Sequence, residues 1–323
     1  MLASRTPIVA TQLSSSADAA AAARTGVLYA LAAYGLWGIF PVYFKWVSHI
    51  RADEILAHRI VWSVGFCALL LTWTGRWPNV AAIVRSKRAW AALSVSAVLV
   101  AINWLCFIYA VVTDRILEAS LGYFINPLVS IVLGMVFLGE RLRPMQWLAV
   151  AFAAGGVVYL TTQEGLPWIA ITVAVTFGLY GLVRKQAKPG PLAGLFFETL
   201  LLAPIAAVYM LWLWTASADG LVFATGAWDD RGLLLCAGVL TTLPLLYFAA
   251  AAKRLPLSTL GFFQYIAPTA QFAAGLFYGE PFSTERAIAF ALIWIGIAIF
   301  IVESWRRAQQ SSHRSAQTPG PRR

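Results

Sequence analysis

Residues 54–73 read EILAHRIVWSVGFCALLLTW, and this stretch indicates the fold class of the whole chain. After Arg59 it continues to Trp73 without a charged residue, and its apolar positions do not alternate with polar ones. An unbroken apolar run of about 20 residues is typical of an α-helix that crosses a bilayer, whereas a transmembrane β-strand shows about 10 alternating residues. The stretch therefore predicts a membrane-spanning helix that carries Glu54, His58 and Arg59 near one end.

The composition of the 323-residue chain extends this pattern. Hydrophobic residues make up 60% of the sequence and charged residues 12%, whereas a soluble domain carries about 25% charged residues. We therefore predict an all-α integral membrane protein with tails at 1–25 and 305–323 that we expect to be disordered. The ten predicted spans are 27–47, 55–74, 90–112, 117–138, 143–162, 166–185, 192–214, 232–252, 257–278 and 286–304.

The basic residues predict the orientation of the chain in the membrane. Of 24 Lys and Arg residues, 18 fall in the two tails and the loops after spans 2, 4, 6 and 8, and 5 fall in the opposite loops. Cytoplasmic loops carry the excess of Lys and Arg, so we expect both termini in the cytoplasm. The net charge of +10 then reflects membrane topology, and we expect no nucleic acid partner.

The second half of the sequence repeats the first half at an offset of about 140 residues. Because each half holds five predicted spans, an odd number, the repeats 26–162 and 163–304 should insert with opposite orientation, as in many secondary transporters. Three blocks match in the same order: Gly38, Phe40 and Lys45 with Gly178, Tyr180 and Lys185; YFINP (123–127) with QYIAP (264–268); and FLGE (137–140) with FYGE (277–280).

The matched blocks also resemble a known family. The segments GLWGIFPVYFKW, EILAHRIVWS, INWLCFIYAV, LGYFINPL and FLGERL, with LGFFQYIAPT and YGEPF in the second half, resemble EamA domains of the drug/metabolite transporter superfamily. The combination resembles the RarD branch, whose members are named as chloramphenicol-sensitive proteins, over roughly residues 26–303. The resemblance implies a ten-helix, multi-pass permease of the bacterial inner (plasma) membrane for small metabolites or drugs, as a monomer or homodimer. Export is the direction typical of the family.

The sequence contains no G-x-x-x-x-G-K-[ST] loop for nucleotide hydrolysis. We therefore expect transport to be driven by an ion gradient or by the solute concentration, without a cofactor. The three histidines and three cysteines show no metal-binding or catalytic spacing, so we expect no metal site, no catalytic residue and no enzyme activity. A non-transporting scaffold or sensor stays open as an alternative, although the paired repeats favour a transporter.

Ionisable groups inside the spans are the first candidates for the transport pathway. Such a group costs about 2.5–3.5 kcal/mol at the centre of a membrane helix and should face protein or water. His58 and Glu198 stand 140 residues apart, at equivalent positions of the two repeats. Three interpretations stay open: proton coupling through these groups, contact with the solute without proton transfer, and snorkelling of side chains at helix ends toward the membrane surface.

Arg59 keeps its proton under all ordinary conditions. One interpretation is that it lines the outer vestibule and attracts an anionic group of the solute. The other is an ion pair on the same side of the membrane, with Glu54, Asp53, Asp114 or Glu118 as the partner. Helical phase places His58 with Trp62 on one face and Arg59 with Ser63 on a neighbouring face, so only part of this cluster can point into a cavity.

The remaining candidates are uncharged. The amide candidates for the pathway inside the spans are Asn103, Asn126, Gln264 and Gln271. Aromatic side chains inside the spans predict a cavity for flat or amphipathic solutes, whereas those at span ends, such as Trp46, Trp73, Trp77, Trp90, Trp168 and Trp305, suit an interfacial belt. The aromatic candidates for the cavity are Tyr34, Trp37, Trp62, Tyr109, Tyr123, Tyr180, Tyr247 and Tyr265.

Two pairs of helix-perturbing residues complete the sequence pattern. Pro127 and Pro268 occupy equivalent positions in the fourth and ninth spans and predict either a shared hinge or static kinks, because proline removes a helical hydrogen bond. Gly275 and Gly279 form a G-x-x-x-G pattern that favours close helix packing.

Overall fold

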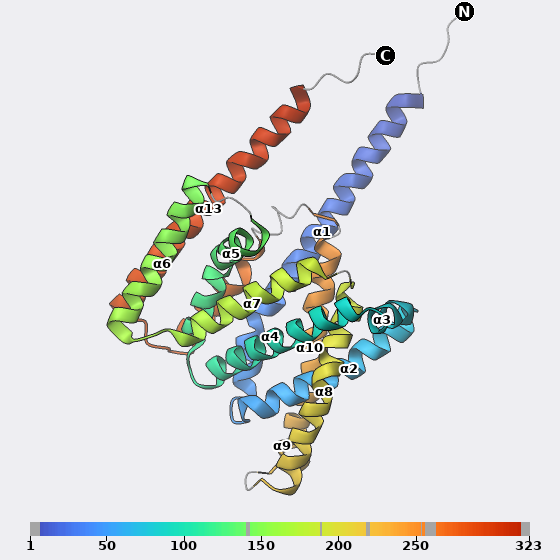
Figure 1. Cartoon of the computed structure of the whole chain (residues 1–323), viewed down its shortest axis with the longest axis vertical. Helices are drawn as coiled ribbons and strands as arrows, with labels where there is room; N and C mark the ends of the chain where they lie inside the picture. The colour runs from blue at the N-terminus through green and yellow to red at the C-terminus, as the bar shows by residue number, and fades with distance from the viewer. Residues whose placement is uncertain are drawn as a thin grey trace, which may run out of the picture.

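The computed structural model describes residues 7–139, 143–187, 189–217, 220–252, 254–255 and 263–317, and the regular secondary structure of these residues is helical (Figure 1). The helices are α1 (Pro7–Trp46), α2 (Ala52–Trp73), α3 (Trp77–Val84), α4 (Lys87–Val112), α5 (Ile116–Leu138), α6 (Pro144–Glu164), α7 (Trp168–Gln186), α8 (Pro191–Thr215), α9 (Val222–Thr225), α10 (Trp228–Ala252), α12 (Ile266–Phe277) and α13 (Thr284–Gln317).

Eight of these helices are long and apolar enough to cross a membrane: α1 from Ala21 onward, α2, α4, α5, α6, α8, α10, and α13 as far as Glu303. The spans predicted at 166–185 and 257–278 correspond to shorter apolar helices, Trp168–Arg184 and Ile266–Phe277. Residues 256–262, at the start of the latter span, lie outside the described residues. A multi-pass helical membrane protein is therefore confirmed, and the number of ten spans stays a prediction.

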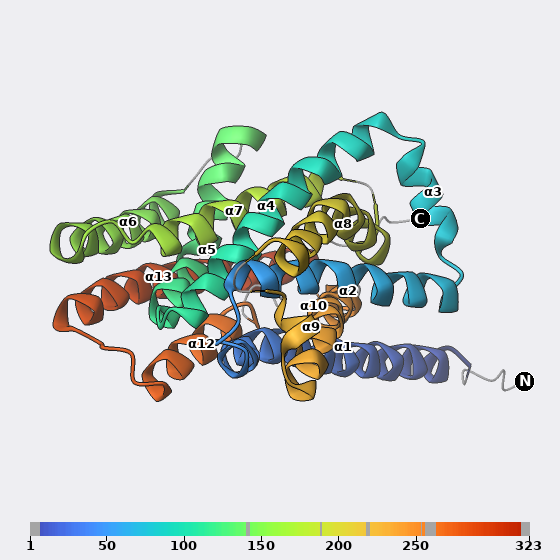
Figure 2. The ribbon, with the colours of Figure 1, turned by 90° about the horizontal axis from the view of Figure 1, so that it is seen from below.

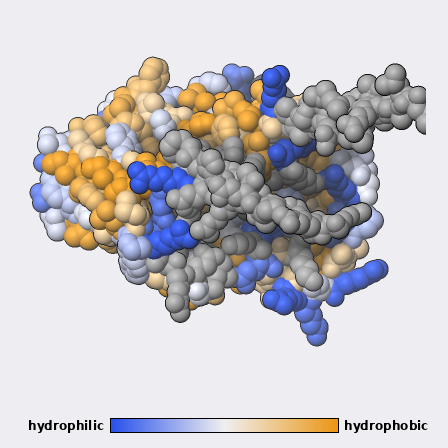
Figure 3. Space-filling model, turned by 90° about the horizontal axis from the view of Figure 1, so that it is seen from above, coloured by the Kyte–Doolittle hydropathy of each residue, from blue (hydrophilic) through white to orange (hydrophobic). Residues whose placement is uncertain are grey.

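The surface of the helices suits a lipid environment. Large apolar side chains such as Ile205, Val208 and Phe277 are exposed, and Figure 3 shows hydrophobic patches on the left and upper parts of the face in view. The tryptophans that we expected in an interfacial belt stand at helix ends with exposed side chains at Trp46, Trp73, Trp77, Trp90 and Trp168. The side chain of Trp305 lies outside the described residues.

Helices α1 and α13 extend into the described parts of the two tails, for which we predict disorder. α1 begins at Pro7 and α13 continues to Gln317. Residues 17–24 read ADAAAAAR, and alanine has the highest helix propensity of all residues. From residue 305 to Gln317 neither glycine nor proline interrupts the sequence, so the last helix has no residue that breaks it. Composition alone predicts disorder in these two segments, because they are polar or contain few large apolar residues.

The helices pack in pairs that cross between the two halves of the chain. α6 lies beside α13 at one side of the molecule, and α2 contacts both α8 and α10 (Figure 1 and Figure 2). α1 packs against α10 and α12, while α7 packs against α4 and α5. The first turns of α1 and the last turns of α13 project from the same end of the molecule in Figure 1.

Glycines mark the closest helix contacts. A Cβ atom on Gly238 of α10 would lie 2.4 Å from the carbonyl carbon of Trp62 in α2, so the two backbones touch there. A Cβ atom on Gly275 of α12 would lie 2.8 Å from Cδ2 and 3.3 Å from the amide nitrogen of Leu117 in α5, which is a close helix contact as the G-x-x-x-G pattern predicts. The same prediction is wrong for Gly279, which has no atom within 4 Å of its Cβ position and adopts a φ of 78° after the end of α12.

Candidate functional site

The guanidinium group of Arg59 lies in the interior of the helix bundle, and its side chain is 4% exposed. Its Nε donates a hydrogen bond to Thr241 Oγ1 of α10 at 2.7 Å. Its Cζ lies 4.2 Å from the ring centroid of Trp104 in α4, and 5.6 and 5.8 Å from the rings of Phe40 and Phe44 in α1. Its Nη1 is buried and has no hydrogen-bond partner in the described part of the chain.

The ion pair that we considered for Arg59 is absent among the described residues. The four candidate carboxylates are engaged elsewhere: Asp53 with Arg51 at 2.7 Å, Asp114 with Lys45, Glu118 with Arg115 at 2.5 Å, and Glu54 with the N–H of Val222 at 2.8 Å. The ion-pair interpretation is therefore wrong, because all four carboxylates have other partners, including Glu54, which is itself buried.

A neutral polar cluster adjoins the Arg59 site. Asn103, next to Trp104, donates through Nδ2 to the carbonyl of Val173 at 3.0 Å and accepts from the Tyr123 hydroxyl at 3.1 Å. The guanidinium group of Arg59 lies over the ring of Trp104, the residue that follows Asn103 in α4. The structure therefore brings three predicted site residues, Arg59, Asn103 and Tyr123, together at the junction of α2, α4 and α5.

The second amide pair lies further along α5. Asn126 Nδ2 donates to the carbonyl of Ala174 in α7 at 3.0 Å, and Gln264 Nε2 donates to Asn126 Oδ1 at 3.5 Å. These bonds satisfy buried amides and fasten α5 to α7. Asn126 is therefore buried and Gln264 half-buried, with protein groups as their partners. That they face the transport pathway stays a prediction.

His58 is fully buried beside Arg59 on α2, with 0% of its surface exposed. Trp62 Nε1 donates to His58 Nδ1 at 3.1 Å, and the ring of Phe223 lies 4.9 Å from the imidazole. Because Nδ1 accepts this bond, the neutral tautomer carries its proton on Nε2, which lies 3.9 Å from Glu54 Oε1. His58 and Trp62 therefore form one aromatic and polar group with Phe223 and Glu54.

Glu198 of α8 is also fully buried. Ser96 Oγ of α4 donates to its Oε1 at 2.5 Å, the Tyr180 hydroxyl donates to its Oε2 at 3.5 Å, and Arg184 Nη1 lies 3.6 Å away. Burial is the opposite of what snorkelling requires, so the snorkelling interpretation does not describe His58 or Glu198. Each of these two residues has its own set of partners, and the structure does not bring them together.

The remaining aromatic candidates divide into interior and peripheral residues. Tyr34 and Trp37 pack edge to face at 5.3 Å, and Gln271 Nε2 donates to the Trp37 carbonyl at 3.1 Å. Tyr109 is 38% exposed and lines an open apolar groove instead of the interior. The two others are Tyr247, which stacks on Tyr29, and Tyr265, whose buried hydroxyl has no partner among the described residues.

The two candidate hinge prolines do not occupy equivalent places in the described helices. Pro127 lies in the middle of α5, where proline removes a helical hydrogen bond. Pro268 lies in the first turn of α12, which begins at Ile266. Backbone N–H groups of a first turn have no helical acceptor, so Pro268 breaks no hydrogen bond within this helix. A shared hinge at both prolines stays a prediction.

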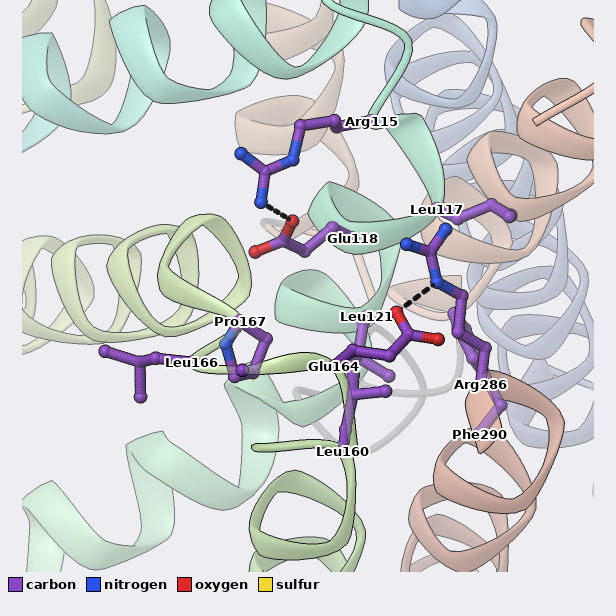
Figure 4. Close-up of a pocket in the computed structure, with 11 residues that line it drawn as sticks. Arg115, Leu117, Glu118, Leu121, Leu160, Glu164, Leu166, Pro167, Arg286 and Phe290 are labelled. Atoms are coloured by element: carbon purple, nitrogen blue, oxygen red, sulfur yellow. Dashed lines mark hydrogen bonds and ion pairs between the residues drawn. The ribbon is translucent and has the colours of Figure 1, made fainter. Parts of the chain in front are cut away.

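One cavity lies apart from these residues, between the ends of α5, α6, α7 and α13. Figure 4 shows two ion pairs in its wall, Arg115 with Glu118 and Arg286 with Glu164, the latter at 2.8 Å. None of the residues predicted for the pathway lines this cavity. The pair of Arg286 and Glu164 joins the start of α13 to the end of α6, whereas Arg115 and Glu118 both stand at the start of α5. Glu118 also accepts a hydrogen bond from the N–H of Ile169 in α7 at 2.9 Å, so both carboxylates fasten neighbouring helices at this end of the bundle.

A carboxylate caps the start of α5 at the same end. Glu280 accepts hydrogen bonds from the backbone N–H groups of Ile116 and Leu117, at 2.5 and 2.8 Å. Burial raises the pKa of this carboxyl above its usual range, while the two N–H groups oppose that rise. Across the described residues, no three His, Cys, Asp or Glu side chains come together in a way that would hold a metal ion.

Sequence reasoning missed several partners of the predicted residues. Thr241, Phe40 and Phe44 around Arg59, and Ser96 beside Glu198, were not among the candidates. One signal was present for Thr241, because the segment GVLTTLPLL places two adjacent hydroxyl side chains inside an otherwise apolar span.

Comparison with known proteins gives consistent matches. A family model described as the EamA-like transporter family matches residues 24–162. Protein RarD from Salmonella typhimurium is 50% identical over 283 residues, which cover 87% of this chain and 96% of that protein. An uncharacterized transporter from Vibrio cholerae is 49% identical over 284 residues, covering 87% and 93% of the two chains. A crystal structure that is 19% identical aligns over 87% of this chain and 98% of its own with a TM-score of 0.57, which shows a shared fold.

Proposed function

This chain belongs to the EamA-like transporter family, with RarD as a close relative, and from this membership we propose that it is a secondary transporter of small organic solutes. It works by alternating access between two inverted five-helix repeats in the bacterial inner membrane, with both termini in the cytoplasm. In this proposal, the direction of transport is export of metabolites or drugs from the cell. Membership in a transporter family and eight long apolar helices support this proposal.

One helix contact that occurs twice carries the proposal of inverted repeats. A Cβ atom on Gly38 of α1 would lie 2.7 Å from Ala270 Cβ of α12, and a Cβ atom on Gly178 of α7 would lie 3.2 Å from Val129 Cγ1 of α5. Gly178 follows Gly38 by 140 residues, and Ala270 follows Val129 by 141, which is the offset between the YFINP and QYIAP blocks. The same helix contact is thus built from equivalent residues in the two halves.

The pairing of the helices has the same symmetry. Exchanging the two halves turns the contact of α4 with α7 into that of α10 with α1, and the contact of α2 with α10 into that of α8 with α4. Three contacts stay the same under this exchange, because each joins two equivalent helices: α2 with α8, α5 with α12, and α6 with α13. Equivalent helices that pack on each other around a common axis support two repeats of opposite orientation, with the pathway at their interface.

We further propose that protons drive transport through His58 and Glu198. Both side chains are fully buried and titratable, and they occupy equivalent positions in the repeats. His58 lies in the half of α2 that begins at Ala52, while Glu198 lies in the half of α8 that begins at Pro191. Since α2 and α8 enter from opposite sides in the proposed topology, the two groups are placed toward opposite faces of the membrane.

A flux assay in proteoliposomes tests the transport function. The purified chain is reconstituted, and the movement of a panel of labelled amphipathic solutes is followed with and without a pH gradient. We expect protein-dependent flux of at least one solute that increases with the gradient. His58→Ala and Glu198→Gln should remove the response to the gradient, whereas Asp229→Asn, which changes an exposed carboxylate, should keep it.

The outcomes separate transport from its coupling. Flux that ignores the pH gradient and survives both His58→Ala and Glu198→Gln contradicts proton coupling through these residues and leaves transport intact. The orientation is tested with a reporter fused to the C-terminus, for which we expect a cytoplasmic location. A periplasmic reporter would contradict the proposed topology.

A further inference from the structure

We propose that the buried guanidinium group of Arg59 binds the anionic group of the transported solute, and that the solutes are small organic monoanions with an aromatic or apolar body. This inference rests on the proposed transport function and adds the chemical class of the substrate. It is carried by the partners of Arg59, by the neutral groups around it and by the absence of an equivalent charge in the second half of the chain.

The charge of Arg59 is incompletely compensated by the protein. A buried ion normally has a partner of opposite charge, because removing it from water costs several kcal/mol. Arg59 has instead one hydroxyl acceptor, Thr241 Oγ1, and the ring of Trp104 at 4.2 Å. A guanidinium group has five N–H donors, and Nη1 is buried without a partner within the described residues. A carboxylate or sulfonate accepts two parallel hydrogen bonds from such a group.

The surroundings of Arg59 limit the charge of the solute to one. The side chain that accepts a hydrogen bond from Arg59, Thr241, is neutral, and so are Asn103 and Tyr123 of the adjoining polar cluster. A single cation among neutral groups balances one negative charge, whereas a second negative charge would be buried without compensation. The structure therefore favours monoanions over phosphate esters and dicarboxylates.

Aromatic rings around Arg59 indicate the body of the solute. Trp104 covers one face of the guanidinium group, and Phe40 and Phe44 of α1 lie within 6 Å of it. Tyr43, on the same stretch of α1, packs its ring against that of Phe44 with 5.0 Å between the ring centroids. Such rings offer stacking and edge contacts to an apolar or aromatic molecule. They lie beside the charge, so a solute with an anionic group attached directly to a ring would contact both.

Comparison between the repeats shows that the helix packing does not require this charge. The residue equivalent to Arg59 at the offset of 140 is Thr199, which donates to the carbonyl of Leu195 in its own helix at 2.9 Å. The residue equivalent to Thr241 is Ala101. The scaffold is therefore built twice, while the guanidinium group and its hydroxyl partner occur once. Since the equivalent position in the second repeat carries no charge, the helix packing does not need the guanidinium group of Arg59. Binding of a ligand explains its presence better.

The test compares three probes of similar size: benzenesulfonate, which is a permanent anion, benzenesulfonamide, which is neutral near pH 7, and benzyltrimethylammonium, which is a cation. Binding to the purified full-length chain in lipid nanodiscs is measured by tryptophan fluorescence and by the shift in thermal unfolding temperature. Flux of the same labelled probes is measured in proteoliposomes. The wild-type chain alone already decides charge selectivity, so the test does not depend on a variant that folds.

We expect benzenesulfonate to bind and to move, and the other two probes to bind at least about tenfold more weakly, which corresponds to one charged hydrogen-bonded contact. Arg59→Gln should lose at least about tenfold in benzenesulfonate affinity. Arg59→Lys, which keeps the charge without the planar fork, should fall between Arg59→Gln and wild type. Arg85→Gln, which removes an exposed cation at the end of α3, should bind as wild type does.

Two results would overturn the inference. One is binding of the neutral or cationic probe as tight as that of benzenesulfonate, and the other is unchanged benzenesulfonate affinity in a folded Arg59→Gln chain. If the sulfonamide or the ammonium probe moves and the sulfonate does not, transport stands and the anion site is wrong. If benzenesulfonate binds through Arg59 and no solute moves at all, the transport function is wrong and the anion site stands.

Discussion

Replacing Gly238 by alanine should push α10 away from α2 and disturb the Arg59 site. The added Cβ atom would lie 2.4 Å from the carbonyl carbon of Trp62, 2.5 Å from its oxygen and 2.8 Å from the amide nitrogen of Ser63. These are backbone atoms of a helix, so they cannot rotate away as a side chain can. Because carbon atoms in contact prefer about 3.5–4.0 Å, the helices must separate locally by about 1 Å.

The expected magnitude combines two effects. Overpacking of a well-packed interior costs about 1–3 kcal/mol. Separation of the helices also lengthens the 2.7 Å hydrogen bond from Arg59 to Thr241, and a hydrogen bond to a charged group contributes about 1.5–3 kcal/mol. Because the hydrogen bond between Arg59 and Thr241 is only partly lost, we expect the free energy of unfolding to fall by about 2–4 kcal/mol. Thermal unfolding of the purified chain, followed by tryptophan fluorescence, measures this loss.

Gly232 of the same helix provides the matched control. It has no atom within 4 Å of its Cβ position, and alanine is better than glycine inside a helix by about 0.5–1 kcal/mol. Gly232→Ala should therefore leave the unfolding temperature unchanged or raise it slightly. Equal effects of Gly238→Ala and Gly232→Ala would refute the close backbone contact between α2 and α10.

Three further predictions follow from single contacts. Gly38→Ala and Gly178→Ala should each lower the unfolding temperature, while Gly35→Ala and Gly181→Ala, with no neighbour within 4 Å, should not; an effect in one repeat alone would argue against equivalent contacts. Glu280→Ala should cost about 1–2 kcal/mol in unfolding free energy by uncapping α5, with a smaller loss for Glu280→Gln, and identical stability of all three chains would contradict the cap. A double-mutant cycle of Asn103→Leu and Tyr123→Phe should show a coupling free energy of about 0.5–1.5 kcal/mol from their 3.1 Å hydrogen bond, and strict additivity would contradict it.

The membrane class and most of the long helices were predictable from the sequence, because hydrophobic run length alone determines them. The run from Glu54 to Trp73 is an example, since α2 covers Ala52–Trp73. The short helices α3 and α9 were not predicted, because segments of eight and four residues carry too little periodic signal. Disorder of the two tails, which low hydrophobicity predicts, stays a prediction.

The interior position of the polar residues was predicted, but most of their partners were not. That His58, Asn103 and Glu198 face protein follows from the cost of an unpaired polar group in lipid. The partner of Arg59, in contrast, is Thr241, which is 182 residues away in sequence. Nothing in one sequence determines which neighbouring helix a buried side chain faces. The acidic residues expected on the same side of the membrane as Arg59 suggested an ion pair, but each of them has another partner.

The repeat was the most informative pattern, because it connects sequence and packing. An offset of about 140 residues relates the glycines Gly38 and Gly178 and also their neighbours across the helix interface, Ala270 and Val129. It equally shows where the halves differ, at Arg59 and Thr199. Shared positions therefore explain the scaffold, and differing polar positions identify candidates for the solute site.

Alternating access is tested most directly by locking the two halves together. His49 Nε2 and Asp230 Oδ1 lie 2.9 Å apart and join the two halves at one end of the bundle. Cysteines are introduced as His49→Cys and Asp230→Cys in a Cys236→Ser background, since Cys236 is exposed while Cys67 and Cys106 are buried. A short cleavable reagent that reacts with both thiols is applied to proteoliposomes, with each single cysteine variant as the control. We predict that cross-linking stops solute flux and that cleavage of the linker restores it; undiminished flux through a fully cross-linked chain would contradict alternating access between the two halves.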